Sequence, residues 1–130
     1  MITINSLDHL VMTVRDLDVT IDFYQRVLGM TSQTFGSEQR RSLHFSNQKI
    51  NLHLAGHEFE PKAHVALPGT ADLCFISQTP MDEIVAHLHR EQIEIIDGPR
   101  PRTGAMSKLN SIYFRDPDQN LIEVSNEAQG

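Results

Sequence analysis

Two ionisable side chains lie within apolar, strand-like segments at opposite ends of the chain. His9 lies within Leu7–Val14, and Glu123 lies within Leu121–Val124. An ionisable group in an apolar strand either costs stability or belongs to a functional site. Imidazole and carboxylate groups are good ligands for divalent metal ions. Because the chain also repeats internally, we expect the two residues to serve one shared site.

The composition of the chain limits its class. Its 130 residues are about the length of one ordinary domain, and 39% hydrophobic and 22% charged residues are typical of a soluble globular protein. No apolar run approaches the ~20 residues of a membrane span, and the N-terminus does not resemble a signal peptide. The single cysteine, Cys74, fits a reducing compartment, and a net charge of −6 argues against nucleic-acid binding. We therefore expect a cytoplasmic protein that binds neither nucleic acid nor membrane.

The two halves of the chain have the same order of predicted elements, β-α-β-β-β. In the first half, the predicted elements are a strand over 7–14, a helix over 17–28 between a cap at Asp16 and a stop at Gly29, and strands over 31–35, 41–46 and 49–54. In the second half, they are a strand over 71–77, a helix over 81–91 after Pro80, and strands over 94–96, 111–115 and 121–125. The modules span about 5–56 and about 70–127 of a single domain, 1–130. A long loop over 97–110 is a candidate functional segment.

Two such modules predict an α+β fold, in which a curved mixed sheet has helices outside and an open cup inside. Alternation along each strand then divides core side chains from cup side chains. The residues expected to face the cup are His9, Val11, Thr13, Asn51, His53, Asp72, Cys74, Ser111, Tyr113, Glu123 and Ser125. The cup is therefore the predicted location of the site.

Three motifs resemble those of a known superfamily. They are Asp8-His9-Leu10-Val11, Ile21-Asp22-Phe23-Tyr24 followed by Leu28-Gly29, and Tyr113-Phe114-Arg115-Asp116-Pro117-Asp118 with Leu121-Ile122-Glu123. The pattern resembles the vicinal oxygen chelate superfamily of glyoxalase I, fosfomycin-resistance thiol transferases, bleomycin-resistance proteins and extradiol dioxygenases. The resemblance spans nearly the whole chain. Within the superfamily, the chain looks most like small, virulence-associated, lactoylglutathione-lyase-like proteins with a glyoxalase domain.

The resemblance implies metal ligands on the first and last strands of each module, at His9, Asn51, Asp72 and Glu123. Asp72 stands where the family commonly has histidine, and Asn51 stands where glyoxalase I has a carboxylate or amide. We expect His9, Asp72 and Glu123 to hold one divalent ion, which could be nickel, zinc, manganese or iron. Asn51 is a weak ligand, and we expect it to contact the substrate. This set would leave open metal positions, which Lewis-acid catalysis requires.

Further residues are expected to act on the substrate. Glu123 or His53 would move a proton, and His53 could instead be a fourth ligand. Tyr113 and Ser111 match positions that contact substrate in the thiol-transferase branch.

A basic group formed by Arg100, Arg102 and Lys108 has two interpretations. It is either a solvated loop or a clamp for an anionic substrate, with Arg102 as the expected contact.

The chain departs from the family pattern at some positions. Thr13 replaces an arginine that holds the carboxylate of the thiol cofactor in glyoxalase I, so the resemblance does not imply glutathione binding. In the turn Asp116-Pro117-Asp118-Gln119-Asn120, we expect Asn120 to supply the left-handed geometry, so that the turn is kept. Cys74 is expected to be a small buried hydrophobic residue.

The function predicted from these features is a metal-dependent lyase or isomerase of the glyoxalase type. A small oxygenated substrate would chelate the ion through two adjacent oxygens. One alternative is thiol transfer to an epoxide, as in fosfomycin resistance. Another is a metal-free protein of the bleomycin-resistance type that sequesters an organic ligand. We expect a homodimer, in which a site could draw residues from both chains.

Overall fold

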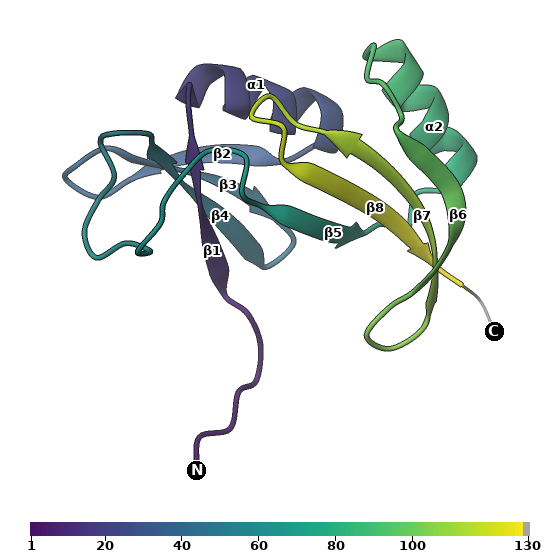
Figure 1. Cartoon of the computed structure of the whole chain (residues 1–130), viewed down its shortest axis with the longest axis horizontal. Helices are drawn as coiled ribbons and strands as arrows, with labels where there is room; N and C mark the ends of the chain where they lie inside the picture. Colours follow the sequence, from purple (N-terminus) through teal and green to yellow (C-terminus); the bar gives the residue numbers. More distant parts are fainter. Residues whose placement is uncertain (129–130) are drawn as a thin grey trace. The chain divides into compact units, whose positions relative to one another are not determined.

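The computed structural model describes residues 1–128 and divides the chain into two compact units, Met1–Pro68 and Gly69–Gly130. The first unit contains β1 (His9–Val14), α1 (Leu17–Leu28), β2 (Thr31–Phe35), β3 (Arg40–Phe45) and β4 (Gln48–Leu54) (Figure 1). The second contains β5 (Asp72–Ile76), α2 (Met81–Arg90), β6 (Asp97–Thr103), β7 (Lys108–Arg115) and β8 (Leu121–Glu127). The predicted βαβββ order therefore occurs in each unit.

Each unit forms one four-stranded mixed sheet. The strand order is β1-β4-β3-β2 in the first unit and β5-β8-β7-β6 in the second. The first strand of each unit pairs in parallel with the last, and the other neighbours are antiparallel. The α+β fold predicted from the sequence, with two βαβββ modules, is confirmed.

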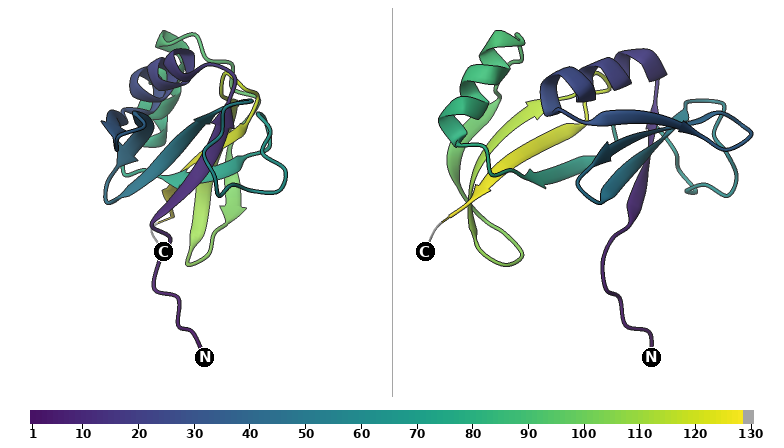
Figure 2. Two further views of the ribbon diagram at one scale, coloured as in Figure 1. Left: turned by 90° about the vertical axis from the view of Figure 1, so that its left-hand side faces the viewer. Right: turned by 180° about the vertical axis from the view of Figure 1, so that it is seen from behind.

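Helix α1 begins and ends where its sequence predicts. The Asp16 carboxylate accepts a hydrogen bond from the backbone N–H of Val19 at 3.0 Å, which caps the first turn. Gly29 ends the helix in the left-handed conformation, at φ 68°, which glycine adopts without steric cost. The helix lies along one face of the sheet of its own unit (Figure 2).

The sheet face toward α1 forms the core of the first unit. Val14, Leu43 and Ile50 are fully buried, together with Tyr24 of the helix. These residues alternate with polar ones along β1, β3 and β4, so the polar residues occupy the opposite face. The second unit repeats this arrangement, with Ile112, Phe114 and Ile122 fully buried.

The segment 97–110 is a β-hairpin and not the predicted loop, and the predicted strand over 94–96 is wrong. Strand β6 begins at Asp97 and pairs with β7, which begins three residues before the predicted strand. Two prolines and several charged residues hide the strand pattern in the sequence. They are tolerated because β6 is an edge strand, where proline need not donate to a neighbour, and because a bulge lies between Asp97 and Arg100.

The Asp-Pro-Asp turn is kept, but Asn120 does not have the predicted role. Gln119 is the left-handed residue, at φ 70°. The Asp116 carboxylate accepts the backbone N–H groups of Asp118 and Asn120 at 2.9 Å each and the Asn120 amide Nδ2 at 2.8 Å. Asn120 Oδ1 in turn accepts the N–H of Ala71 at 2.9 Å. The asparagine therefore links the turn to the segment that leads into β5.

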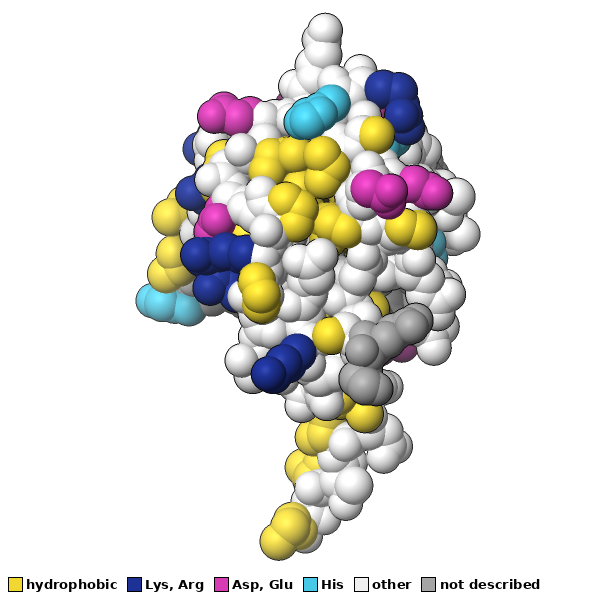
Figure 3. All heavy atoms as spheres, turned by 90° about the vertical axis from the view of Figure 1, so that its right-hand side faces the viewer, with side chains coloured by type: hydrophobic (Ala, Val, Ile, Leu, Met, Phe, Trp, Pro, Cys, Tyr) yellow, Lys and Arg dark blue, Asp and Glu magenta, His cyan; other side chains and the backbone are white. Residues whose placement is uncertain are grey.

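The surface carries some exposed apolar side chains. Ile76 and Met106 in the second unit are 52% and 95% exposed. On the face drawn in Figure 3, apolar side chains gather in a group that acidic and basic side chains border. Neither helix of the described chain has the length and apolar composition that crossing a membrane requires.

Candidate functional site

In the first unit, strand pairing places the predicted residues of β1 and β4 on one face. Val11 pairs with Asn51, and Thr13 pairs with His53. His9 lies two residues before Val11 and therefore shares this face, diagonally from Asn51. This is the face opposite α1, as alternation along the strands predicted.

His9 is held by its neighbour in a geometry that suits a metal ligand. Its Nδ1 atom lies 2.8 Å from Oδ1 of Asp8, and its side chain is 42% exposed. When Nδ1 carries the proton, the carboxylate accepts it and the lone pair of Nε2 is available to a ligand. A carboxylate on the second ring nitrogen is typical of metal-binding histidines.

Asn51 has a buried amide oxygen with an unmet hydrogen-bonding capacity. Its Oδ1 atom accepts no hydrogen bond from the residues that the structure describes. A buried polar atom without a partner costs about 1–3 kcal/mol, so such atoms are rare and call for an explanation. A metal ion or a substrate hydroxyl would satisfy this oxygen.

His53 is less accessible than its place on this face suggests. It is buried, at 6% exposed, and its ring packs edge-to-face against Phe59 at 5.5 Å between centroids. Arg40 lies over the Phe59 ring at 4.2 Å. Burial and the positive charge of Arg40 lower the pKa of His53, and Glu58 partly opposes them. The imidazole is therefore neutral and able to accept a proton at neutral pH.

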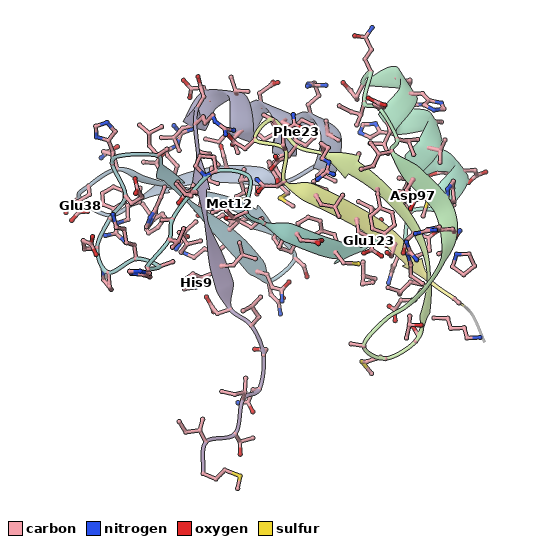
Figure 4. The ribbon with its side chains drawn as sticks, in the orientation of Figure 1. His9, Met12, Phe23, Glu38, Asp97 and Glu123 are labelled. Atoms are coloured by element: carbon pink, nitrogen blue, oxygen red, sulfur yellow. The ribbon has the colours of Figure 1, made fainter. Side chains whose placement is uncertain are left out.

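In the second unit, the equivalent strands β5 and β8 carry the equivalent pair. Cys74 pairs with Glu123, which Figure 4 labels, and Asp72 lies two residues before Cys74. Asp72 and Glu123 therefore share one face diagonally, as His9 and Asn51 do in the first unit. Tyr113 of β7 is the register partner of Glu123 on its other side.

A chain of hydroxyl groups supports the Glu123 carboxylate. Ser125 Oγ donates to Glu123 Oε2 at 3.3 Å and lies 2.6 Å from Ser111 Oγ. Ser111 is fully buried, and its hydroxyl contacts the Ser125 hydroxyl that donates to Glu123.

The prediction that Cys74 is buried is wrong, because it shares the exposed face of β5 with Asp72. The Cys74 Sγ atom lies 3.4 Å from Ser125 Oγ. Desolvation of the thiol and the nearby Glu123 carboxylate raise the pKa of Cys74, while the Ser125 hydrogen bond opposes this. The thiol is therefore neutral at neutral pH, which does not favour a nucleophile.

Tyr113 links Glu123 to the predicted basic group. Arg102 Nε donates to Tyr113 Oη at 2.8 Å. Desolvation raises the pKa of Tyr113, the Arg102 hydrogen bond lowers it, and the hydrogen bond and negative charge of Glu123 raise it. The phenol therefore stays protonated and can donate to the carboxylate.

Asp97, which sequence reasoning did not identify, holds both arginines of the basic group. Its Oδ2 atom lies 2.9 Å from Arg100 Nη2 and 3.6 Å from Arg102 Nη2. Figure 4 labels Asp97 on β6. Asp97 is also the register partner of Tyr113 across the β6–β7 hairpin, and the sequence gives no local signal of this pairing.

Each unit thus supplies a pair of potential ligands. Within residues 1–128, neither unit brings together three side chains of the His, Cys, Asp or Glu type that could hold a metal ion by themselves. The donors within each pair, an imidazole with an amide oxygen in the first unit and two carboxylates in the second, are of types that bind divalent cations. The orphaned oxygen of Asn51 fits such an ion as well.

Comparison with known proteins identifies the family. Residues 6–124 match the Glyoxalase/Bleomycin resistance protein/Dioxygenase superfamily. The chain is 52% identical over 122 residues to virulence protein STM3117 of Salmonella typhimurium, covering 94% of this chain and 84% of that protein. It is 52% identical over 124 residues to the glyoxalase domain-containing protein RDO1 of Mycosarcoma maydis, covering 95% and 69%.

Solved structures show the same fold. An integron cassette protein of V. cholerae, VCH_CASS1, superposes with a TM-score of 0.95 at 49% identity, covering 98% of this chain and 99% of that one. The metallothiol transferase FosB of Lysinibacillus sphaericus is a more distant relative, 30% identical over 121 residues, covering 93% of this chain and 82% of that protein.

Proposed function

The chain belongs to the glyoxalase/bleomycin resistance protein/dioxygenase superfamily, and we propose that it is a metal-dependent enzyme of the glyoxalase type. Its substrate would be a small molecule that presents two adjacent oxygens. The observation that carries the proposal is the equivalence of two polar pairs, His9 with Asn51 and Asp72 with Glu123. Each pair lies at the same register positions of its own module.

We assign His9, Asp72 and Glu123 as the metal ligands and Asn51 as a substrate contact that could also reach the ion. Asp8 supports this role for His9, because it occupies Nδ1 and leaves Nε2 for the metal. A bound divalent ion would stabilise negative charge that develops on a substrate oxygen. These ligands could belong to one chain or to two chains of a dimer.

Proton transfer is assigned to Glu123 or His53. Ser125 and Tyr113 would hold the Glu123 carboxylate in one orientation. Burial lowers the pKa of His53 and so keeps its imidazole neutral at neutral pH. The neutral ring would have a lone pair with which to accept a proton from the substrate. Tyr113 would also contact the substrate, whereas Arg102 and the buried Ser111 would act on the site through Tyr113 and Ser125.

Metal stoichiometry tests the proposal most directly. Chelator-stripped protein would be titrated with nickel, zinc and manganese by calorimetry. We expect about one ion per chain, with binding lost in His9→Ala and in Glu123→Ala. His64→Ala, which changes an exposed histidine, is the matched control and should bind normally. Normal binding in Glu123→Ala, or full lyase activity in that variant, would contradict the assignment.

Thiol transfer to an epoxide is the second candidate. The 30% identity to the metallothiol transferase FosB favours it. It uses the same metal ligands but predicts that the metal-loaded protein consumes a thiol in the presence of an epoxide. Absence of saturable metal binding would instead favour a protein that sequesters an organic ligand.

We also propose that the protein is a homodimer. Strand β1 forms one edge of the first sheet, and β5 forms one edge of the second. Edge strands present backbone groups that can pair with another chain. Light scattering should give about twice the mass of one chain, and a mass of 14.7 kDa would contradict the proposal.

A further inference from the structure

Lys49, which sequence reasoning did not single out, lies beside the assigned metal ligand of the first unit. It is the register partner of His9 on β1 and of His44 on β3. Side chains of register partners lie on the same face of a sheet and are close enough to interact. Lys49 also lies two residues before Asn51 along β4, so it shares the face opposite α1 with the polar pair of this unit. A cation is therefore the neighbour of that pair.

The second unit has no cation at the equivalent position. Asp72 has the place in β5 that His9 has in β1, and its register partner on β8 is Leu121. The two modules therefore carry equivalent polar pairs with different neighbours, a lysine in the first and a leucine in the second. Because the same strand position accepts leucine, the fold of the module does not require a charge there.

An aromatic ring holds the Lys49 ammonium on this face. Its Nζ atom lies 4.2 Å from the centroid of the Phe35 ring. Within residues 1–128, no carboxylate forms an ion pair with Lys49, whereas Arg40 on the same face contacts Glu38 at 3.4 Å. An aromatic face attracts a cation but does not replace an oxygen acceptor for the three N–H donors of an ammonium. These donors are therefore open to a ligand.

The basic group of the second unit is a weaker candidate for contact with an anion. Arg100 and Arg102 share the Asp97 carboxylate at 2.9 and 3.6 Å, and Arg102 also donates to Tyr113. A carboxylate of the second unit thus partly neutralises the charge of both arginines. The charge of Lys49 has no such partner among the described residues.

Asn51 adds an acceptor to the donors of Lys49. Its Oδ1 atom is buried and accepts no hydrogen bond from the described residues. Its register partner on β3 is Ser42, which is fully buried although it lies on the same face. A small ligand on this face thus meets an ammonium that can donate and an amide oxygen that can accept. This pair of groups matches a negatively charged oxygen next to a hydroxyl.

The charge balance of the assigned metal site also favours an anion. A neutral His9 with the carboxylates of Asp72 and Glu123 would balance the charge of a divalent ion. Lys49 then adds one positive charge beside His9. A negatively charged oxygen of the substrate would be attracted to this charge, whereas a neutral oxygen gains much less.

We propose that Lys49 is a specificity-determining residue, which binds a negatively charged oxygen of the substrate while Asn51 accepts a hydrogen bond from its hydroxyl. The inference rests on the proposed function, because the ion at His9 brings the substrate next to Lys49. The Phe35 ring keeps the ammonium on this face before the substrate binds. The ligand class is a small 2-hydroxy acid, in which the two groups are on adjacent carbons.

A matched ligand pair tests this inference. Glycolate and glycolamide have the same carbon skeleton and the same hydroxyl, and they differ in charge. Their dissociation constants would be measured on manganese-loaded protein from the paramagnetic relaxation of the ligand protons. Lys49→Met, which keeps most of the side-chain length without the charge, should weaken glycolate binding by about tenfold or more and leave glycolamide binding unchanged. Tenfold corresponds to about 1.4 kcal/mol, the scale of one partly screened charge interaction.

Two further variants show whether charge at this position is responsible. Lys49→Arg keeps the charge and should retain most of the glycolate affinity. Lys108→Met makes the neutralising change at an exposed lysine of the second unit and should leave both probes unaffected. Unchanged glycolate binding in Lys49→Met, or an equal loss in Lys108→Met, would overturn the inference.

Manganese affinity separates the role of Lys49 in ligand binding from a structural role. Removal of a positive charge beside His9 should leave manganese binding unchanged or tighten it, because like charges repel. A variant that damages the fold would weaken manganese and glycolate binding together. Parallel losses of the two affinities in Lys49→Met would therefore overturn the inference.

Manganese titration of the unaltered protein distinguishes failure of this inference from failure of the proposed function. If manganese binds but glycolate affinity does not depend on Lys49, the role of Lys49 is wrong and the metal assignment stands. If manganese does not bind, the proposed function is wrong, and glycolate would be titrated into the metal-free protein and followed by amide chemical shifts. Binding that is lost in Lys49→Met would then support the role of Lys49, and absence of binding to the unaltered protein would overturn it.

Discussion

Asp72 and Glu123 lie diagonally across one face of the second sheet, because Cys74, two residues after Asp72, is the register partner of Glu123. His9 and Asn51 have the same relation in the first unit. Each βαβββ module therefore carries one polar pair at equivalent positions.

Asn51→Asp should tighten metal binding if the amide oxygen of Asn51 faces the ion. A carboxylate is a stronger ligand than an amide for a divalent cation, and the Asn51 Oδ1 atom has no hydrogen bond to lose. We expect at least about tenfold tighter binding of manganese or zinc by calorimetry, equivalent to about 1.4 kcal/mol. Asn47→Asp makes the same charge change at an exposed turn. Equal effects of the two variants would show that net charge alone is responsible.

Tyr113→Phe should weaken metal binding by about tenfold or more. Hydrogen-bonding partners of metal ligands typically contribute 10–100-fold to affinity. Tyr113 is the register partner of Glu123 and can donate its hydroxyl to that carboxylate while it accepts from Arg102 Nε. Arg102→Lys keeps the charge but loses this Nε donor, so it should weaken binding in the same direction.

Arg100→Lys is the matched control for this prediction, because Arg100 contacts Asp97 and its contacts do not include Tyr113. Zinc affinity and the urea midpoint of unfolding would be measured for all three variants. If affinity falls only in proportion to lost stability, or if Arg100→Lys weakens binding as much as Tyr113→Phe, the positioning role of Tyr113 is wrong.

Asn120→Ala should lower the free energy of unfolding by about 2 kcal/mol or more. The substitution removes the hydrogen bond that Asn120 Nδ2 donates to the buried Asp116 carboxylate and the one that Asn120 Oδ1 accepts from the Ala71 N–H, and each lost hydrogen bond costs about 0.5–1.5 kcal/mol, more where one partner is charged. Urea unfolding followed by circular dichroism measures the change.

Gln119→Gly is the opposing test in the same turn. Gln119 adopts φ 70°, a conformation that costs a non-glycine residue stability, so glycine should raise the free energy of unfolding by about 1 kcal/mol. If Gln119→Gly lowers the free energy of unfolding and Asn120→Ala leaves it unchanged, the roles assigned to the two residues in the turn are wrong.

His53 should make the stability of the metal-free protein depend on pH. Its pKa in the folded protein is below the ordinary value of 6.5, so the unfolded chain takes up the proton more readily. The contribution of His53 to the free energy of unfolding should therefore be complete above about pH 6.5, and it should be lost as the pH falls below that value. His53→Gln should reduce this slope, measured by urea unfolding between pH 5 and 8, roughly the range in which histidine titrates.

His64→Gln, at an exposed histidine in the same unit, provides the comparison for His53→Gln. It should leave the pH dependence as it is in the unaltered protein. If the free energy of unfolding of His53→Gln depends on pH as steeply as that of the unaltered protein, groups other than His53 cause the dependence.

The sequence by itself determined the βαβββ order of each module, the ends of α1 and the face on which the site residues of β1, β4, β5, β7 and β8 lie. These features depend on local rules. Helix caps act within one turn, and alternation divides the side chains of a strand without regard to its partners. For this reason the sequence predicts that His9 lies on the same face as His53. It likewise predicts that Asp72 lies on the same face as Glu123.

Only the tertiary structure decided what surrounds these residues. The segment 97–110 forms a hairpin through the β6–β7 pairing, and its bulge between Asp97 and Arg100 interrupts the alternation of side chains along β6. The Asp97 carboxylate contacts Arg100 and Arg102, and Arg102 donates to Tyr113 on the paired strand. In the first unit, the segment after β4 placed Phe59 against the His53 ring. These contacts join residues whose separation in sequence carries no periodic signal, so they arise from register and packing, which the local pattern does not encode.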